Sequence, residues 1–122
     1  MTEQEESIVE AGMREAYADC HQFKSEGVRN LDWMAEQGVP RDQAIYLFRR
    51  YVGSYNNFRA ELLEALPAAS MVIPAREGGV CVYVYFPGAI DTAYIENMKY
   101  EMNADEADIE KESSGLVRFW WD

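Results

Sequence analysis

The stretch Val80–Phe86, VCVYVYF, decides the fold class, because β-branched and aromatic residues of this density are typical of a strand. Alternate side chains of a strand point to opposite faces of the sheet. One face would hold Val80, Val82, Val84 and Phe86, and the other would hold Cys81, Tyr83 and Tyr85. We therefore expect a sheet with one aliphatic face and one face that carries tyrosines.

Two other stretches have a similar composition and are expected to join this strand. The sequence MVI, 71–73, precedes it and is separated from it by PAREGG, whose proline and glycines are typical of a hairpin connection. The sequence LVRFWW, 116–121, is expected to pair with the strand at 80–86, either antiparallel or parallel after a helical crossover. Together they predict a small, mostly antiparallel, three-stranded sheet.

The remaining segments have the apolar spacing of helices. The segment 5–26 has an apolar stripe at steps of three and four residues, and a shorter helix is expected at 31–37. From 40 to 67 the pattern predicts one long helix or two collinear helices, with Gly53 as the point of bending. A further helix is expected at 89–102, AIDTAYIENMKYEM. Its core-facing residues would be Ile95, Met98 and Met102.

These segments add up to an α+β fold in a single domain, 1–122. Its N-terminal helical half, of two to three helices, is expected to pack on the small three-stranded sheet, which also carries a C-terminal helix. The chain is long enough to bury a core without disulfides or metal. We expect Cys20 and Cys81 to be free thiols in a reducing compartment.

A run of acidic residues follows the helix at 89–102. It has six carboxylates against one base, Lys111. They are Glu101, Asp105, Glu106, Asp108, Glu110 and Glu112. The apolar stripe weakens after Met102, so the helix should end near Asn103, or a new helix should begin at Asp105. We expect this segment to be exposed, mobile and poorly tied to the core.

Motifs for metal binding and catalysis do not match the chain. A calcium-binding loop that began at Asn103 would have Asp108 where glycine is needed and Ser114 where glutamate is needed. The one histidine, His21, is adjacent to Cys20 on an expected helix, where neighbouring side chains point about 100° apart. No phosphate-binding glycine loop is present. We therefore expect no metal and no cofactor, and these observations give an enzyme no support.

The segment 31–52 has a loose likeness to a helix-turn-helix, which makes a DNA-binding regulator one alternative. A glycine–valine turn is followed by an expected helix that carries Arg41, Gln43, Arg49 and Arg50. Positions where the motif prefers a small and an apolar residue are occupied by Met34 and Gln37. The net charge of −11 works against contact with phosphates. These arginines are more readily explained as ion-pair partners of the acidic segments.

The aromatic face and the acidic run together favour a protein partner with a basic surface. Aromatic anchors surrounded by charge are how protein interfaces gain affinity and speed of association. The aromatic anchors would be Tyr83, Tyr85, Trp120 and Trp121. The other interpretation is that a helix, or a second copy of the chain in a homodimer, covers these aromatic residues.

The first functional hypothesis is a small acidic inhibitor that occupies a basic, nucleic-acid-binding surface of its partner and binds no nucleic acid itself. Anti-CRISPR and anti-restriction proteins of phages and mobile elements commonly have this size and charge, which is an analogy of class. A small ligand-binding domain or enzyme with a pocket beside Tyr83 and Tyr85 is a further alternative. The acidic N-terminus and the lack of a run of about 20 apolar residues predict a cytoplasmic protein without membrane contact.

Overall fold

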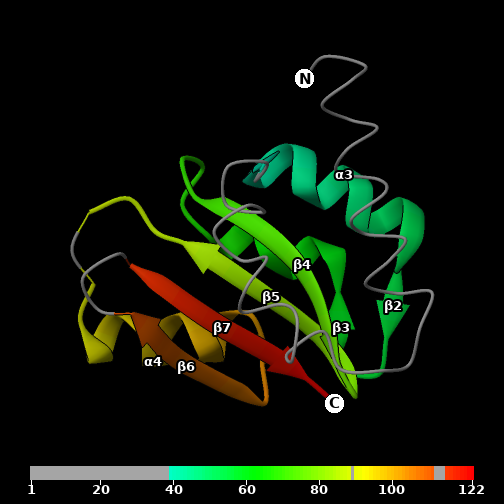
Figure 1. Ribbon diagram of the computed structural model, residues 1–122. Helices are drawn as coiled ribbons and strands as arrows, with labels where there is room; N and C mark the ends of the chain where they lie inside the picture. Colours follow the sequence, from blue (N-terminus) through cyan, green and yellow to red (C-terminus); the bar gives the residue numbers. More distant parts are fainter. Residues whose placement is uncertain (1–38, 89, 112–114) are drawn as a thin grey trace.

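The computed structural model describes residues 39–88, 90–111 and 115–122, and the expected helices at 5–26 and 31–37 lie outside these residues. Helices, strands and short connections alternate along the described part (Figure 1). They are β1 (Val39–Pro40), α3 (Arg41–Tyr51), β2 (Ser54–Tyr55), β3 (Phe58–Arg59), the 3-10 helix η1 (Ala60–Ala65), β4 (Met71–Glu77), β5 (Gly79–Tyr85), α4 (Thr92–Glu101), β6 (Glu106–Lys111) and β7 (Leu116–Trp121).

The main sheet is antiparallel and has the strand order β1-β4-β5-β7-β6, while β2 and β3 form a separate two-stranded hairpin. β1 contributes only two residues, so four longer strands make up most of the sheet. The expected pairing of the last strand with the strand at 80–86 is confirmed, and of the two directions considered it is antiparallel, from Tyr85 opposite Leu116 to Val80 opposite Trp121. The expectation of a single three-stranded sheet is wrong, because β1 and β6 were not recognised as strands.

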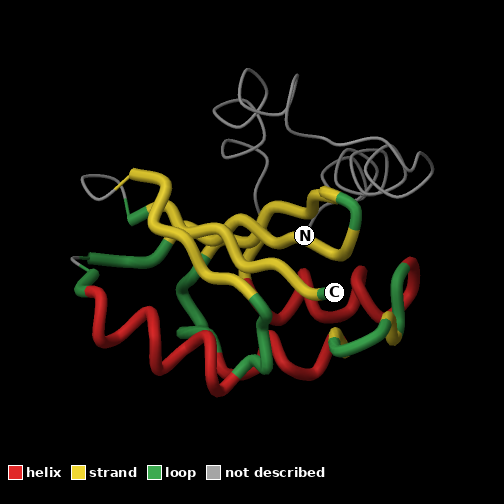
Figure 2. The backbone as a smooth tube through the Cα atoms, turned by 90° about the horizontal axis from the view of Figure 1, so that it is seen from below, coloured by secondary structure: helices red, strands yellow, loops and turns green. Residues whose placement is uncertain are grey.

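The described helices all lie on one side of this sheet (Figure 2). Between helices and sheet lies the main core, to which β5 contributes Val80, Val82 and Val84, each at most 1% exposed. The helical side contributes buried residues from α3, η1 and α4, among them Phe48, Leu63 and Ile95. The aliphatic face expected of the strand at 80–86 is therefore confirmed.

The opposite face of the sheet carries a second, smaller cluster of buried residues. It consists of Ile73, Ala75, Cys81, Tyr83 and Leu116, with Tyr85 and Trp120 half-buried beside them. The alternation along β5 is thus as expected, and of the two interpretations of the aromatic residues the structure shows them buried or half-buried. Tyr83 is only 4% exposed on this face, and Trp121 is fully buried in the main core on the other.

The prediction of one long helix or two collinear helices at 40–67 is wrong. The prediction of an N-terminal helical half is therefore wrong as well. α3 ends at Tyr51, and Gly53 follows with a φ of +66°, a conformation that suits glycine. The chain then forms the β2–β3 hairpin, with Asn56 at a φ of 48° in its turn. Asparagine tolerates this left-handed conformation better than most residues, so the pair Asn56–Asn57 was the sequence signal for a turn.

β4 is longer than the expected strand, because four residues of the expected hairpin connection belong to it. Pro74 lies opposite Val82 in the ladder and has no N–H to donate. β1 pairs with β4 only at Met71 and Val72, so Pro74 lies where no other described strand flanks β4 on its outer side. The turn between β4 and β5 is formed at Gly78, whose φ is +77°.

The C-terminal helix is confirmed, and α4 directs Ile95, Met98 and Met102 into the core. Asp91 caps its first turn, since the carboxylate accepts a hydrogen bond from the backbone N–H of Tyr94 at 2.8 Å. The helix ends at Glu101, and the residues that follow form the strand β6. A second helix from position 105 was therefore the wrong alternative.

Replacing Gly79 with alanine should destabilise the protein more than replacing Gly78. An ideal Cβ at Gly79 would lie 2.1 Å from the carbonyl oxygen of Trp121, whereas a Cβ at Gly78 meets nothing within 4 Å. Gly78→Ala should cost about 1 kcal/mol for its left-handed backbone, and Gly79→Ala about 3 kcal/mol for the steric conflict. Urea unfolding measures both, and equal losses would contradict the close approach of β5 and β7.

Candidate functional site

The acidic residues singled out in the sequence gather along β6 and just before it. Glu101 ends α4, Asp105 lies in the turn, and Glu106, Asp108 and Glu110 belong to β6. All five side chains are exposed. Glu112 lies outside the described residues. Of the four aromatic residues expected beside them, Trp120 and Tyr85 are half-buried, and Tyr83 and Trp121 are buried.

The start of β6 is fixed to the end of the chain by three hydrogen bonds. The indole N–H of Trp121 donates to the carbonyl of Met102 at 2.9 Å. The backbone N–H of Asp105 donates to the carbonyl of Trp120 at 2.9 Å. The carboxylate of Asp105 accepts from the backbone N–H of Asp122 at 2.7 Å. The expectation that this segment is poorly tied to the core is therefore wrong.

The guanidinium of Arg118 is the centre of the ionic network on this side of the sheet. Arg118 projects from β7 with its side chain only 9% exposed. Its Nε lies 2.5 Å from the carboxylate of Glu77, which is 5% exposed at the end of β4. Its Nη1 lies 3.0 Å from Asp108 and 3.7 Å from Glu106, both on β6. One cation on β7 thus contacts carboxylates of both β4 and β6.

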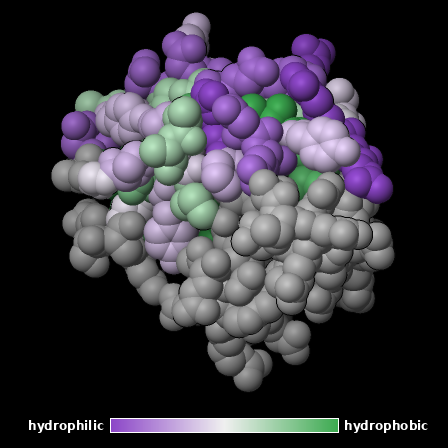
Figure 3. Space-filling model, turned by 90° about the horizontal axis from the view of Figure 1, so that it is seen from above, coloured by the Kyte–Doolittle hydropathy of each residue, from purple (hydrophilic) through white to green (hydrophobic). Residues whose placement is uncertain are grey.

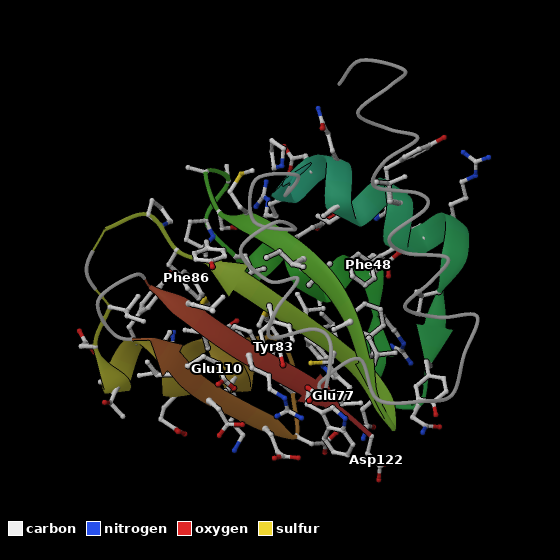
Figure 4. The ribbon with its side chains drawn as sticks, viewed as in Figure 1. Phe48, Glu77, Tyr83, Phe86, Glu110 and Asp122 are labelled. Carbon is white, nitrogen blue, oxygen red and sulfur yellow. The ribbon has the colours of Figure 1, made fainter. Side chains whose placement is uncertain are left out.

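The carboxylate of Glu77 receives several hydrogen bonds at a single oxygen. Its Oε2 accepts from the Arg118 guanidinium, from the Cys81 thiol at 3.0 Å and from the Tyr83 hydroxyl at 3.2 Å. The indole N–H of Trp120 donates to the backbone carbonyl of the same glutamate at 2.8 Å. Figure 4 shows Glu77, Tyr83 and Glu110 on the viewer's side of the sheet. We call Glu77, Cys81, Tyr83 and Arg118 the buried network.

Burial and charge keep the Cys81 thiol and the Tyr83 hydroxyl of the buried network protonated. Burial, and then the charge of Glu77, raise the pKa of the Cys81 thiol well above its usual value. Burial, followed by the neighbouring Cys81 and Glu77, also raises the pKa of the Tyr83 hydroxyl. Burial alone would lower the pKa of Arg118, but the hydrogen bond to Glu77 and nearby negative charge raise it. A protonated thiol is a poor nucleophile, so this arrangement favours a structural role.

The sequence analysis missed Glu77 and Arg118, although one signal was present. Arg118 is the only charged residue in the apolar strand LVRFWW. Strand alternation places it on the same side as Leu116 and Trp120, on the face opposite the main core. A single cation on a largely apolar face needs an anionic partner, but the sequence did not indicate which of 22 acids supplies it.

β6 divides its side chains between two environments. Ala107 and Ile109 are half-buried and pack against the main core. Asp108 lies opposite Arg118 in the ladder, on the other face, and Glu106 lies opposite Trp120. The ladder shifts register between Ile109 and Lys111, which leaves Glu110 as the extra residue of a bulge.

The charge on this part of the sheet is unbalanced. Glu77, Glu106 and Asp108 all contact the guanidinium of Arg118, the one cation among the side chains that the structure describes on this face. Glu110 adds a fourth carboxylate, close enough to raise the pKa of both Cys81 and Tyr83. Among the described side chains, which do not include those of Arg76 and Lys111, no cation pairs with Glu110. The exposed edge of the sheet therefore has an excess of negative charge that a partner cation can neutralise.

The arginines of α3 are engaged within the molecule. Arg41 binds the carboxylate of Asp42 and donates to the carbonyls of Glu64 and Leu66. Arg49 forms ion pairs with Glu61 and Glu64. The partners are nearby acids of α3 and η1, and the acidic run is not among them. This engagement does not favour the helix-turn-helix alternative, whose first expected helix lies outside the described residues.

A shallow groove lies at the C-terminal end of α4. Its lining includes Lys99, Tyr100 and Asn103, and it contains neither Tyr83 nor Tyr85. Figure 3 shows one face of the molecule, on which the described surface is mainly hydrophilic with small hydrophobic spots. Within the described residues, no group of three or more His, Cys, Asp and Glu side chains could hold a metal ion. No helix of that part is long and apolar enough to cross a membrane.

Comparison of the chain with protein-family models, with curated proteins and with solved structures finds no match. The functional argument therefore depends on the geometry and charge of the described residues.

Replacing Arg118 with methionine should lower the free energy of unfolding by about 3 to 5 kcal/mol, because Glu77 is left buried without its cation. Asp108→Asn removes an exposed partner of the same guanidinium and should cost at most about 1 kcal/mol. The double variant Arg118→Met with Glu77→Met should recover part of the loss, since no buried charge remains. Chemical denaturation compares the three, and a cost for Arg118→Met no larger than for Asp108→Asn would contradict the buried network.

The buried thiol of Cys81 should make stability fall at alkaline pH. Its raised pKa means that the unfolded chain loses the thiol proton first, from about pH 8.5. The stabilisation is complete below that pH and is lost as the pH rises toward the pKa of the folded thiol. Cys81→Ala should reduce the alkaline slope by up to about 1.4 kcal/mol per pH unit. Unfolding curves between pH 7 and about 10 measure the slope, and identical slopes would contradict the raised pKa.

Proposed function

We propose that the protein is a small acidic inhibitor that binds a basic surface of a partner protein through β6 and the residues just before it. The observation that carries the proposal is the alternation of exposed carboxylates, Glu106, Asp108 and Glu110, along a strand that is fixed to the core. The sheet already fixes the backbone that carries these carboxylates, so that binding a partner costs little backbone conformational entropy. More of the electrostatic attraction then contributes to the affinity.

The partner that fits this charge is a protein whose basic surface handles nucleic acid. Carboxylates at fixed spacing can occupy sites that otherwise bind phosphates, and at low salt the net charge of −11 speeds the approach of such a surface. Inhibitors of restriction or CRISPR systems carried by phages or mobile elements belong to this class, and their targets are found in the cytoplasm. Tyr83 and Trp121 are buried, so the proposed contact does not include them.

Removing two charges from β6 should weaken retention of the partner, and removing two charges elsewhere should not. The test variant is Glu106→Gln with Glu110→Gln, and the matched control is Glu61→Gln with Glu64→Gln on η1. Both changes alter net charge equally, and the control lies on the helical side of the sheet. Each variant is immobilised and challenged with cell lysate at low and at high salt, and the retained proteins are identified by mass spectrometry.

We expect a nucleic-acid-handling protein that the original chain and the η1 control retain at low salt and release at high salt. The β6 variant should retain about tenfold less of it, which corresponds to about 1.4 kcal/mol. Equal retention by both variants, or retention that salt does not affect, would contradict the proposal.

A further inference from the structure

The outer edge of β6 has no strand beside it within the described residues. β6 is the last strand of the order β1-β4-β5-β7-β6 and is six residues long. In an antiparallel pair, every second residue of an edge strand directs its N–H and C=O away from its neighbour. β6 therefore presents a row of backbone donors and acceptors to the surroundings, beside the carboxylates already described.

The opposite side of the sheet is built differently. β1 is only two residues long and ends in Pro40, which has no N–H to donate. Beyond β1, the outer side of β4 is interrupted by Pro74. Short strands and prolines are the usual means of keeping a sheet edge from pairing. β6 contains no proline, so backbone chemistry leaves its edge able to accept another strand.

Charge decides which strand can add to this edge. Cross-strand neighbours on one face lie about 5 Å apart, so like charges placed opposite each other destabilise the pair. A second copy of β6 would bring its own carboxylates beside Glu106 and Asp108. A segment with lysine or arginine at alternate positions would instead place cations beside Glu106 and Asp108, which share the guanidinium of Arg118 with Glu77, and near Glu110.

We propose that the edge of β6 is a docking site for an extended, basic segment of the partner protein, which adds to the sheet as a further strand. This inference rests on the proposed function and specifies its contact. Backbone hydrogen bonds to β6 hold the added strand, and its alternate basic side chains pair with the carboxylates. The bulge at Glu110 interrupts the regular ladder, so regular pairing is confined to the Glu106–Ile109 part of β6.

The probe for this site is a short capped peptide in which lysine and valine alternate. The control peptide has the same sequence and charge, but its alternate amide nitrogens are methylated and cannot donate hydrogen bonds. Binding of each to the full chain is measured at low salt by calorimetry. Hydrogen exchange, followed by NMR, reports on the backbone amides of β6 with each peptide present.

We expect the unmethylated peptide to bind and to slow exchange at alternate amides of β6. Methylation should weaken binding about tenfold, because the edge then keeps unsatisfied groups. The β6 variant Glu106→Gln with Glu110→Gln should also bind more weakly, and the η1 control should bind as the original chain does.

Two results would overturn the inference. Equal binding of both peptides without slower exchange in β6 would mean that side-chain charge alone makes the contact, and the proposed function would stand. Failure of the unmethylated peptide to bind at low salt would mean that the carboxylates only keep other strands from pairing with the edge of β6. In that case the lysate experiment with the β6 and η1 variants decides separately whether the proposed function survives.

Discussion

The ion pair between Arg118 and Glu77 is the constraint on which the described sheet depends. A guanidinium with its side chain 9% exposed is costly unless it is paired and hydrogen-bonded. Its partners belong to β4 and β6, the strands on either side of the β5–β7 pair. A slip of β7 by one residue would turn Arg118 into the main core and Phe119 out of it. The ion pair and the packing of Phe119 therefore both oppose such a slip.

The same constraint gives the acidic run two roles. Asp108, and at longer distance Glu106, complete the surroundings of Arg118, so part of the run serves the stability of the sheet. Glu110 has no cationic partner within the described residues and lies at a bulge, where pairing with β7 is interrupted. Among the described side chains, carboxylates outnumber the one guanidinium on this face, and the proposed partner contact uses that excess. Stability and binding can thus be altered separately by substitutions only a few residues apart.

The sequence predicted those elements whose local pattern agrees with their surroundings. β5 and β7 are rich in β-branched and aromatic residues, and α4 has both an apolar stripe and a capping aspartate. β6 has the sequence EADIEK, in which only Ile109 favours a strand, so its conformation is imposed by pairing with β7. Local propensity cannot reveal a strand of this kind. The end of α3 was missed for another reason, because two turn residues, Gly53 and Asn56, outweighed a continuing helical pattern.

The exposure of the acidic residues could be predicted from the sequence, and the burial of the aromatic residues could not. Charge can be read from sequence directly, and the five described acids are exposed as expected. The burial of Tyr83 and Trp121 could not be predicted from the sequence. Alternation along a strand shows which residues share a face, but not whether another part of the molecule covers that face. The buried network was harder still, since it joins Glu77 to a residue 41 positions away.

The spacing of the β6 carboxylates favours an extended partner over a helical one. Side chains on one face of a strand recur about every 7 Å, the distance spanned by two residues of another strand. A helix has already used its backbone groups in its own hydrogen bonds, so it could offer β6 only its side chains. At physiological salt, charges more than about 8 Å apart are largely screened. Distant acids of the chain then contribute little, so the proposed recognition would depend on the few carboxylates next to an edge that no other described strand pairs with.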